Sequence, residues 1–403
     1  MPDQDARADV AVKHLDWPVD VLGLLTIAVY GSWYYGFGVL IDDIGAALSI
    51  GRAQLGVAFG CAQLLLGLLS VVTGRALDRF GPVLVLSVVG PIGALLIALS
   101  GRAQTPAAFI LCFSIGGGLA ASAGFYGMTQ SIIVRLDQGA ATHRIIRLTI
   151  WGAFASPVAI PATEALRRNF DWRVAIQVPA VIALLSFVVS ATVLRHTTIA
   201  PTASATPQWS RALRSAFESA AIRWHAAGVF LAFMAMSTLL VFQLSILRWA
   251  GLSAGVAAGF AGARGLLQLL GRLPLRRALA RFGHWGLLFA ARGCVGLACL
   301  IIVLSGRPII AAVYVVVAGV GIGAISALDG IVAREVIPVQ DFGAISGVIT
   351  LLGAIGGGVA PILAGRLIDA SGSPASASVL AACAAVGAMY AVIATNRNHA
   401  RRR

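Results

Sequence analysis

Long apolar stretches recur along nearly the whole chain, and many of them approach the roughly 20 residues that an α-helix needs to cross a lipid bilayer. Strands of a membrane barrel would instead alternate in hydrophobicity over about 10 residues, and the stretches here do not. The chain is 59% hydrophobic and only 11% charged, whereas soluble domains carry about a quarter charged residues. The sequence therefore predicts an all-α membrane protein.

We expect twelve transmembrane helices in two bundles of six. The predicted ranges are 21–41, 54–73, 83–100, 106–134, 148–166 and 174–194, then 224–247, 253–270, 285–304, 309–333, 342–365 and 375–394. The polar segment 195–223 contains IAPTASATPQWS, a composition typical of a linker. The predicted organisation is an N-tail at 1–20, a bundle at 21–194, the linker at 195–223, a second bundle at 224–394 and a basic C-tail at 395–403.

The basic residues indicate on which side each loop lies. The net charge is +14, and most of the 30 Lys and Arg residues fall in the tails, the linker and the loops on the same side. The positive-inside rule places those segments in the cytoplasm. The first 20 residues lack the pattern of a cleaved signal peptide. We therefore expect a multi-pass inner-membrane protein with both termini cytoplasmic.

No pattern indicates a cofactor, a metal site or an enzyme. The five cysteines lie in apolar stretches without a CxxC pair, and the six histidines are scattered. The glycine triplets at 116–118 and 356–358 are not phosphate loops and suit close helix packing. The expected partners are a small-molecule substrate, with H+ as a candidate, and the lipid bilayer, without nucleic acid, and we expect a monomer.

A short motif occurs at equivalent places in the two halves. GRALDRFGP, at 74–82, follows the second predicted helix, and GRLPLRRALARFGHW, at 271–285, follows the eighth. Both begin with Gly-Arg and contain Ala-Leu-x-Arg-Phe-Gly, at 76–81 and 278–283. A repeat at equivalent positions predicts a duplicated six-helix unit, as in transporters built from parallel repeats.

The first copy resembles the loop signature of the major facilitator superfamily, Gly-x-x-x-Asp-Arg-x-Gly. Together with the 6+6 layout, the resemblance covers nearly the whole chain and implies the major facilitator fold. The second copy has Ala280 where the first has Asp78. In the family, the motif in a tight turn after the second helix latches the outward-facing state against the start of the eleventh. This implies a conformational role for Gly74, Asp78, Arg79 and Gly81, and a turn that only sets topology is the alternative.

Shorter motifs resemble the bacterial monocarboxylate-transporter-like group within that family. They are YYGFGVL at 34–40, FDWR at 170–173, FGAISG at 342–347 and GRLIDASGS at 365–373. This finer resemblance implies a small organic anion as substrate, with monocarboxylates as first candidates, held by an arginine of the eighth helix.

Arg264 lies near the middle of the predicted eighth helix. An arginine at this depth costs about 2.5–3.5 kcal/mol on insertion scales and usually faces a cavity or a partner. Gln268, four residues later, shares its helical face, and a guanidinium matches a carboxylate. The resemblance implies that Arg264 binds the anion. The acidic residue that often accompanies this arginine in the group is missing from the eighth helix here. Packing between helices is the alternative role.

Aromatic and amide side chains of the first and fourth helices are further candidates for substrate contact. They share helical faces by their spacing, and in the family fold both helices line the central cavity. Packing in the core is the alternative. The candidates are Tyr30, Trp33 and Tyr34 on the first helix, with Tyr126 and Gln130 on the fourth.

Other charges within or beside predicted helices have weaker signals. Arg292 is expected to snorkel or to pair within the bundle. Asp329 is the candidate proton site, with a gate contact or an ordinary helix-end acid as alternatives. Glu164 precedes Arg167 and Arg168 by three and four residues, which predicts a surface ion pair.

The sequence thus predicts a secondary active transporter that moves a small organic anion by alternating access between two bundles. A drug-type exporter of the same fold is the alternative, although the helix-four arginine and the full glycine-proline motif of helix five are missing. A membrane sensor without transport is a remote alternative that the absence of a sizeable soluble domain disfavours.

Overall fold

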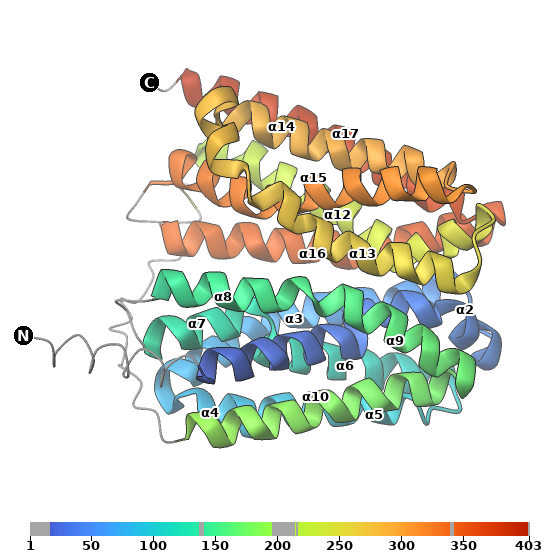
Figure 1. Ribbon diagram of the computed structural model, residues 1–403. Helices are drawn as coiled ribbons and strands as arrows, with labels where there is room; N and C mark the ends of the chain where they lie inside the picture. Colours follow the sequence, from blue (N-terminus) through green and yellow to red (C-terminus); the bar gives the residue numbers. More distant parts are fainter. Residues whose placement is uncertain (1–16, 137–140, 196–213, 215–216, 339–341, 402–403) are drawn as a thin grey trace, which may run out of the picture.

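The computed structural model describes residues 17–136, 141–195, 214, 217–338 and 342–401, and within them the secondary structure is entirely helical. Figure 1 shows two blocks of helices side by side, with the first half of the chain in blue to green and the second in yellow to red. Among the described residues, eleven helical spans are long and apolar enough to cross a membrane. A further helix, which carries Arg264, packs among them. The predicted all-α fold of two six-helix bundles is confirmed.

The helices of the first bundle are Trp17–Leu48, which includes the π-helix η1 (Tyr30–Tyr35) and α2 (Phe37–Leu48); α3 (Arg52–Phe80); α4 (Pro82–Leu84), η2 (Val85–Val89) and α5 (Gly90–Ser100) in one span; α6 (Pro106–Gly124) with α7 (Tyr126–Leu136); α8 (Ala141–Ala153) with α9 (Ala155–Asn169); and α10 (Trp172–Leu194). The helices of the second bundle are α12 (Ala220–Trp249), α13 (Ala254–Arg272), α14 (Leu275–Val303), α15 (Pro308–Val336), α16 (Phe342–Ser371) and α17 (Ala375–Ala400).

Several helices continue beyond their predicted ends. α12 begins at Ala220, four residues early, and α17 continues to Ala400 through most of the predicted C-tail. α14 begins at Leu275, ten residues before the predicted start of the ninth helix at residue 285. Arginine, leucine and alanine favour helix even where they leave the apolar layer, so hydropathy alone ends these helices too soon. Most of the predicted N-tail and linker lie outside the described residues.

The two copies of the repeated motif end in the same backbone conformation. Asp78 and Arg79 lie in the last turn of α3 rather than in a tight turn, which corrects the prediction. The chain bends at Gly81, with φ 75° and ψ −179°, and in the second copy at Gly283, with φ 68° and ψ 163°. A side chain is strained at such positive φ values. Each glycine therefore sets the angle between the helices on either side of it.

The bundles meet more closely at one end than at the other. We call the end where α10 finishes and α12 begins the linker end, at the left of Figure 1, and the opposite one the distal end. In the distal half α3 lies directly on α16, because a Cβ on Gly56 or Gly60 would collide with the backbone of Pro361 or Gly358. Nearer the linker end, nothing lies within 4 Å of a Cβ on Gly74. The two helices therefore diverge toward the linker end.

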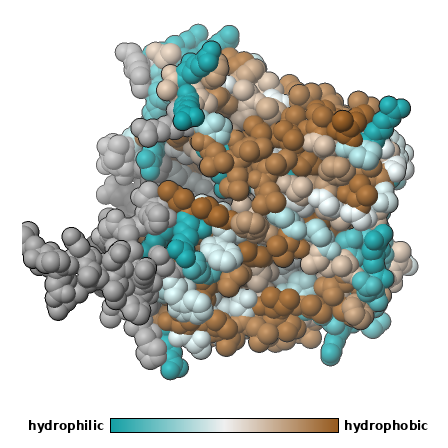
Figure 2. All heavy atoms as spheres, viewed as in Figure 1, coloured by the Kyte–Doolittle hydropathy of each residue, from teal (hydrophilic) through white to brown (hydrophobic). Residues whose placement is uncertain are grey.

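The surface agrees with a membrane location. Figure 2 shows apolar residues across the middle of the visible face and hydrophilic residues toward both ends. Large exposed apolar side chains such as Leu185, Leu300 and Val386 belong to membrane-spanning helices. Lipid would cover these side chains, so the chain is a multi-pass membrane protein.

Candidate functional site

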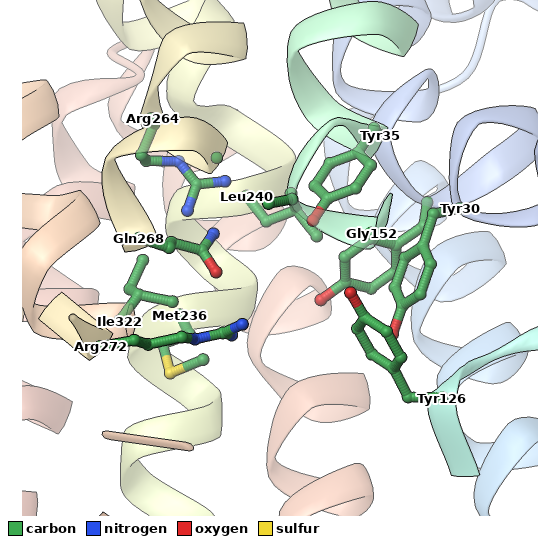
Figure 3. A pocket seen from close by; sticks show the side chains of 13 residues that line it. Tyr30, Tyr35, Tyr126, Gly152, Met236, Leu240, Arg264, Gln268, Arg272 and Ile322 are labelled. Atoms are coloured by element: carbon green, nitrogen blue, oxygen red, sulfur yellow. The ribbon is translucent and has the colours of Figure 1, made fainter. Parts of the chain in front are cut away.

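A cavity of about 170 Å³ lies between the two bundles. Figure 3 shows its lining side chains. The first bundle contributes Tyr30, Tyr34, Tyr35, Tyr126, Gly152 and Ala153, and the second contributes Met236, Leu240, Arg264, Gly265, Gln268, Arg272 and Ile322. The two bundles therefore form the site together, as alternating access around a central site requires.

Arg264 is the buried cation of this cavity. Its side chain is on α13, and the residue is only 4% exposed. Its Nε donates to Oε1 of Gln243 at 3.1 Å, and the hydroxyl of Tyr314 donates to the same oxygen at 3.2 Å. An amide thus orients the guanidinium without neutralising its charge. Within the described chain we find no carboxylate paired with Arg264, and Figure 3 shows its terminal nitrogens directed into the cavity.

Gln268 and Arg272 continue the polar face of α13 toward the linker end. Figure 3 shows them below Arg264, on the side that faces the tyrosines. The Nε of Arg272 donates to the carbonyl of Gly323 at 3.4 Å. The predicted eighth helix ends at residue 270, but α13 continues to Arg272, which is its last residue. Its long side chain extends back into the cavity, which is how arginine at a helix end reaches a polar region.

Tyrosines form the opposite wall, and a π-helix arranges those of the first helix. In η1 the backbone bonds run from i to i+5, which widens the turn. Tyr35 therefore joins Tyr30 and Tyr34 at the cavity. Trp33 turns away into the core, where it is 0% exposed and packs against Phe59 with ring centroids 5.3 Å apart. The α-helical spacing used for prediction misses Tyr35 and includes Trp33.

The fourth helix is interrupted beside the cavity. Between α6 and α7, Phe125 adopts an extended conformation with φ −78° and ψ 170°, and its ring stacks on Tyr30 at 3.6 Å. Tyr126 follows immediately and lines the cavity, whereas Gln130 does not. A Cβ on Gly152 would collide with the hydroxyl of Tyr126, so this glycine makes room for the phenol.

Most of the predicted substrate-site residues line this cavity. It contains Arg264, Gln268, Tyr30, Tyr34 and Tyr126, but neither Trp33 nor Gln130. Sequence reasoning missed Tyr35, Arg272 and the orienting Gln243. The signal for Gln243 was present, because an amide in the middle of an apolar helix is itself unusual.

A second cavity of about 360 Å³ lies nearer the linker end, between α12, α15 and α16. Asp329 lines it together with His225, and Met236 lines both cavities. The Asp329 carboxylate accepts from Arg292 at 2.8 Å, and Arg292, which is 2% exposed, also donates to a carbonyl of α17 at 2.8 Å. Arg292 therefore pairs inside the second bundle. The proton role of Asp329 stays a prediction.

The predicted latch residues lie at the linker end of α3. Asp78 forms an ion pair with Arg135, the basic residue in the last turn of α7. This pair lies within the first bundle, so it fastens α3 to the fourth helix. A contact between the motif and the start of α16 stays a prediction.

Charged groups join the two bundles at the distal end. Arg248, in the last turn of α12, pairs with Glu164 of α9 at 3.0 Å and with Asp42 of α2 at 3.5 Å. Asp369 of α16 accepts from the first two backbone amides of α3 at 3.0 and 2.9 Å. That carboxylate therefore caps a helix of the other bundle, where negative charge is favourable.

Glu164 corrects a prediction. It pairs with Arg167 and Arg168, at 2.9 and 3.2 Å, as its spacing suggested. However, its side chain is only 4% exposed, and Arg248 approaches it from the other bundle. The group is a buried junction between bundles rather than a surface pair. Arg248 is 84 residues away in the chain, so local spacing could not reveal it.

Comparisons with known proteins agree with this architecture. The family model of the Major Facilitator Superfamily matches residues 22–361. Among curated proteins, no match was found. Similar solved structures include the nucleoside transporter NupG, with a TM-score of 0.74 and 16% identity over 96% of this chain and 99% of that one.

Two further solved structures share the fold. A bacterial homolog of the human lysosomal transporter Spinster, inward-facing and unoccupied, gives a TM-score of 0.68 at 16% identity, covering 96% and 94% of the two chains. The E. coli fucose:proton symporter FucP gives 0.61 at 16% identity, covering 93% and 98%. At these identities the likeness shows the fold alone. Because the family model covers most of the sequence, the chain belongs to the major facilitator superfamily of membrane transporters.

Proposed function

We propose that this transporter moves a small organic anion across the inner membrane by alternating access, with Arg264 as the counter-ion of the substrate. The observation that carries the proposal is the state of this guanidinium. It is nearly buried between the bundles, an amide orients it, and its terminal nitrogens are directed into the cavity. Monocarboxylates are the first candidates because of the motif resemblance.

Charge favours an anion over a cationic drug. Burying an arginine without a counter-charge is expensive in a membrane, and a carboxylate can bind its fork in a bidentate manner. The described lining residues include two arginines and no carboxylate. The phenol hydroxyls opposite can donate further hydrogen bonds to an anion. A cationic substrate would meet only repulsion from the arginines.

The positive-inside rule assigns the linker end to the cytoplasm. With the distal end closed by Arg248 and by the contact between α3 and α16, the conformation is then inward-facing. To expose the site to the other side, the distal ion pairs must break and the linker end must close. In this proposal the motif of Gly74, Asp78, Arg79 and Gly81 latches the closed linker end.

Asp329 is the proposed proton carrier. Among the described residues that line the two cavities it is the one carboxylate, and Met236 lines both cavities. Protonation would remove its charge and weaken its bond to Arg292. That would connect proton uptake to a rearrangement of α14 against α15.

The test uses proteoliposomes that enclose a pH-sensitive dye and a panel of small organic acids. Wild type is compared with Arg264→Gln and with Arg277→Gln, a control because Arg277 is exposed at the start of α14. We expect internal acidification by at least one acid, its loss in Arg264→Gln and its retention in Arg277→Gln. Thermal stabilisation by the same acid gives a readout that needs no proton coupling.

The controls separate the two parts of the proposal. Asp329→Asn should still be stabilised by the acid but should no longer acidify the interior. If no acid stabilises wild type, or if Arg264→Gln is stabilised equally, Arg264 is not the counter-ion, and the exporter alternative gains support.

A further inference from the structure

We infer that the substrate carries two separated anionic groups, and that Arg272 is the counter-ion of the second. The inference rests on the proposed function of the Arg264 cavity, and it changes the first candidates from monocarboxylates to a small organic dianion of the dicarboxylate type. The starting observation is that Arg264 and Arg272 both line one cavity whose described residues include no carboxylate.

The helix sets the spacing of the two cations. Arg264, Gln268 and Arg272 follow at intervals of four residues on α13, so they stay on one side of the helix. Eight residues rise by about 12 Å. Figure 3 shows the three side chains one below another, directed toward the tyrosines. Gln268 therefore lies between two cationic ends and can hydrogen-bond the middle of an elongated ligand.

Each guanidinium keeps its charge. Arg264 bonds through Nε to an amide oxygen and Arg272 through Nε to a backbone carbonyl, and both partners are neutral. The terminal nitrogens, which make the paired bonds to a carboxylate, are not used in these two contacts. The hydrogen bond through Nε thus orients each side chain, and its terminal nitrogens can bind a ligand.

The tyrosines of the opposite wall face both arginines. Tyr34 interacts electrostatically with Arg264, Tyr30 and Tyr126 with Arg272, and Tyr35 with both. Figure 3 shows Tyr35 near the level of Arg264 and Tyr126 near the level of Arg272. Both arginines therefore face phenol hydroxyls of the opposite wall. The cavity contains two half-sites for anions, with an apolar side contributed by Met236, Leu240 and Ile322.

The charge balance in the occluded state favours a substrate with two anionic groups over a substrate with one. When both ends of the transporter are closed, both arginines are removed from bulk water. A monoanion would leave one of them without a counter-charge in a low-dielectric site, which is unfavourable. A dianion neutralises both. Because the Arg272 side chain extends back into the cavity that Arg264 lines, two carboxylates at opposite ends of a short chain can each meet one guanidinium, whereas a phosphate monoester concentrates its charge at one half-site.

The test measures binding to the purified full-length transporter by isothermal titration. The probes are butyrate, the dicarboxylates succinate, glutarate and adipate, and glycerol 3-phosphate. We expect at least one dicarboxylate to bind about 10- to 100-fold more tightly than butyrate, because a charge-assisted hydrogen-bond pair is added. Arg272→Gln should remove this advantage, Arg272→Lys should keep part of it, and Arg277→Gln should keep all of it.

The outcomes separate this inference from the proposed function. If Arg264→Gln abolishes binding of butyrate, but dicarboxylates bind no more tightly than butyrate or Arg272→Gln changes nothing, the dianion inference is overturned and the anion transporter stands. If glycerol 3-phosphate binds more tightly than every other probe, the inference of two separated half-sites is overturned. If no probe binds wild type, the proposed function fails as well. Unchanged melting temperatures without ligand establish that the variants are folded.

Discussion

Replacing Arg248 with glutamine should shift the transporter toward a state that is open at the distal end. The substitution removes the ion pairs to Glu164, at 3.0 Å, and to Asp42, at 3.5 Å. A hydrogen bond to a charged group contributes about 1.5–3 kcal/mol, and the more exposed Asp42 pair adds less than about 1 kcal/mol. Glu164 keeps Arg167 as a partner, so it is not left buried and unpaired.

We therefore expect the distal-closed state to lose about 2 kcal/mol relative to the distal-open state, a change of about 30-fold in their ratio. Spin labels at Arg102→Cys and Arg307→Cys report it, because both positions are exposed in distal connections of different bundles. The native cysteines are first replaced by alanine. Double electron–electron resonance should then show a longer distance gaining population in Arg248→Gln.

The control removes an equal charge elsewhere. Arg366→Gln lies on an exposed part of α16 in the distal half, and it should leave the distance distribution unchanged. A double-mutant cycle with Glu164→Gln gives a second check, because the effects of residues in direct contact are not additive. An unaltered distribution in Arg248→Gln, or additive effects in the cycle, would refute the role of this junction in closing the distal end.

Two further predictions concern packing and the cavity wall. Gly60→Ala should favour distal opening in the same spin-label assay, because its Cβ would collide with the carbonyl of Gly358, whereas Gly286→Ala on α14 has open space and should have no such effect. Tyr35→Phe should weaken anion binding about fivefold by removing a hydrogen bond of about 1 kcal/mol, without a loss of thermal stability. Trp33→Phe should lower the melting temperature and leave the affinity unchanged, and the reverse pattern would contradict the π-helical register.

The fold was predictable because the bilayer imposes a length and a composition on every spanning helix. Arg264 was also predictable, since a charge in the middle of an apolar helix is conspicuous. Arg272 was not, because hydropathy treats the residue after the last apolar position as loop, while its side chain extends back into the cavity. The junction of Glu164 with Arg248 depends on how the two bundles dock, which no local pattern contains.

The misassignment on the first helix has one physical cause. The α-helical period makes Tyr30, Trp33 and Tyr34 neighbours, but the π-helical turn of η1 adds a residue to the turn. This exchanges Trp33 for Tyr35 at the cavity. π-helical segments occur often at functional sites and are poorly marked in sequence. The π-helical turn that brings Tyr35 to the cavity is therefore also the reason that α-helical periodicity does not predict it there.

The helix that carries Arg264, α13, packs against α9, a helix of the distal junction, which gives alternating access a physical route. α9 contributes Glu164 to the junction and Ser156 to the contact with α13, where the Ser156 hydroxyl donates to the carbonyl of Gly262 at 3.0 Å. Gly265 is confined against Ser156, because a Cβ there would collide with it. Arg264 lies between these two glycines, so α13 cannot leave α9 without displacing the cation that we propose as the counter-ion of the substrate. A ligand shifts a conformational equilibrium only by its difference in affinity between the states, and moving Arg264 relative to the tyrosine wall supplies that difference.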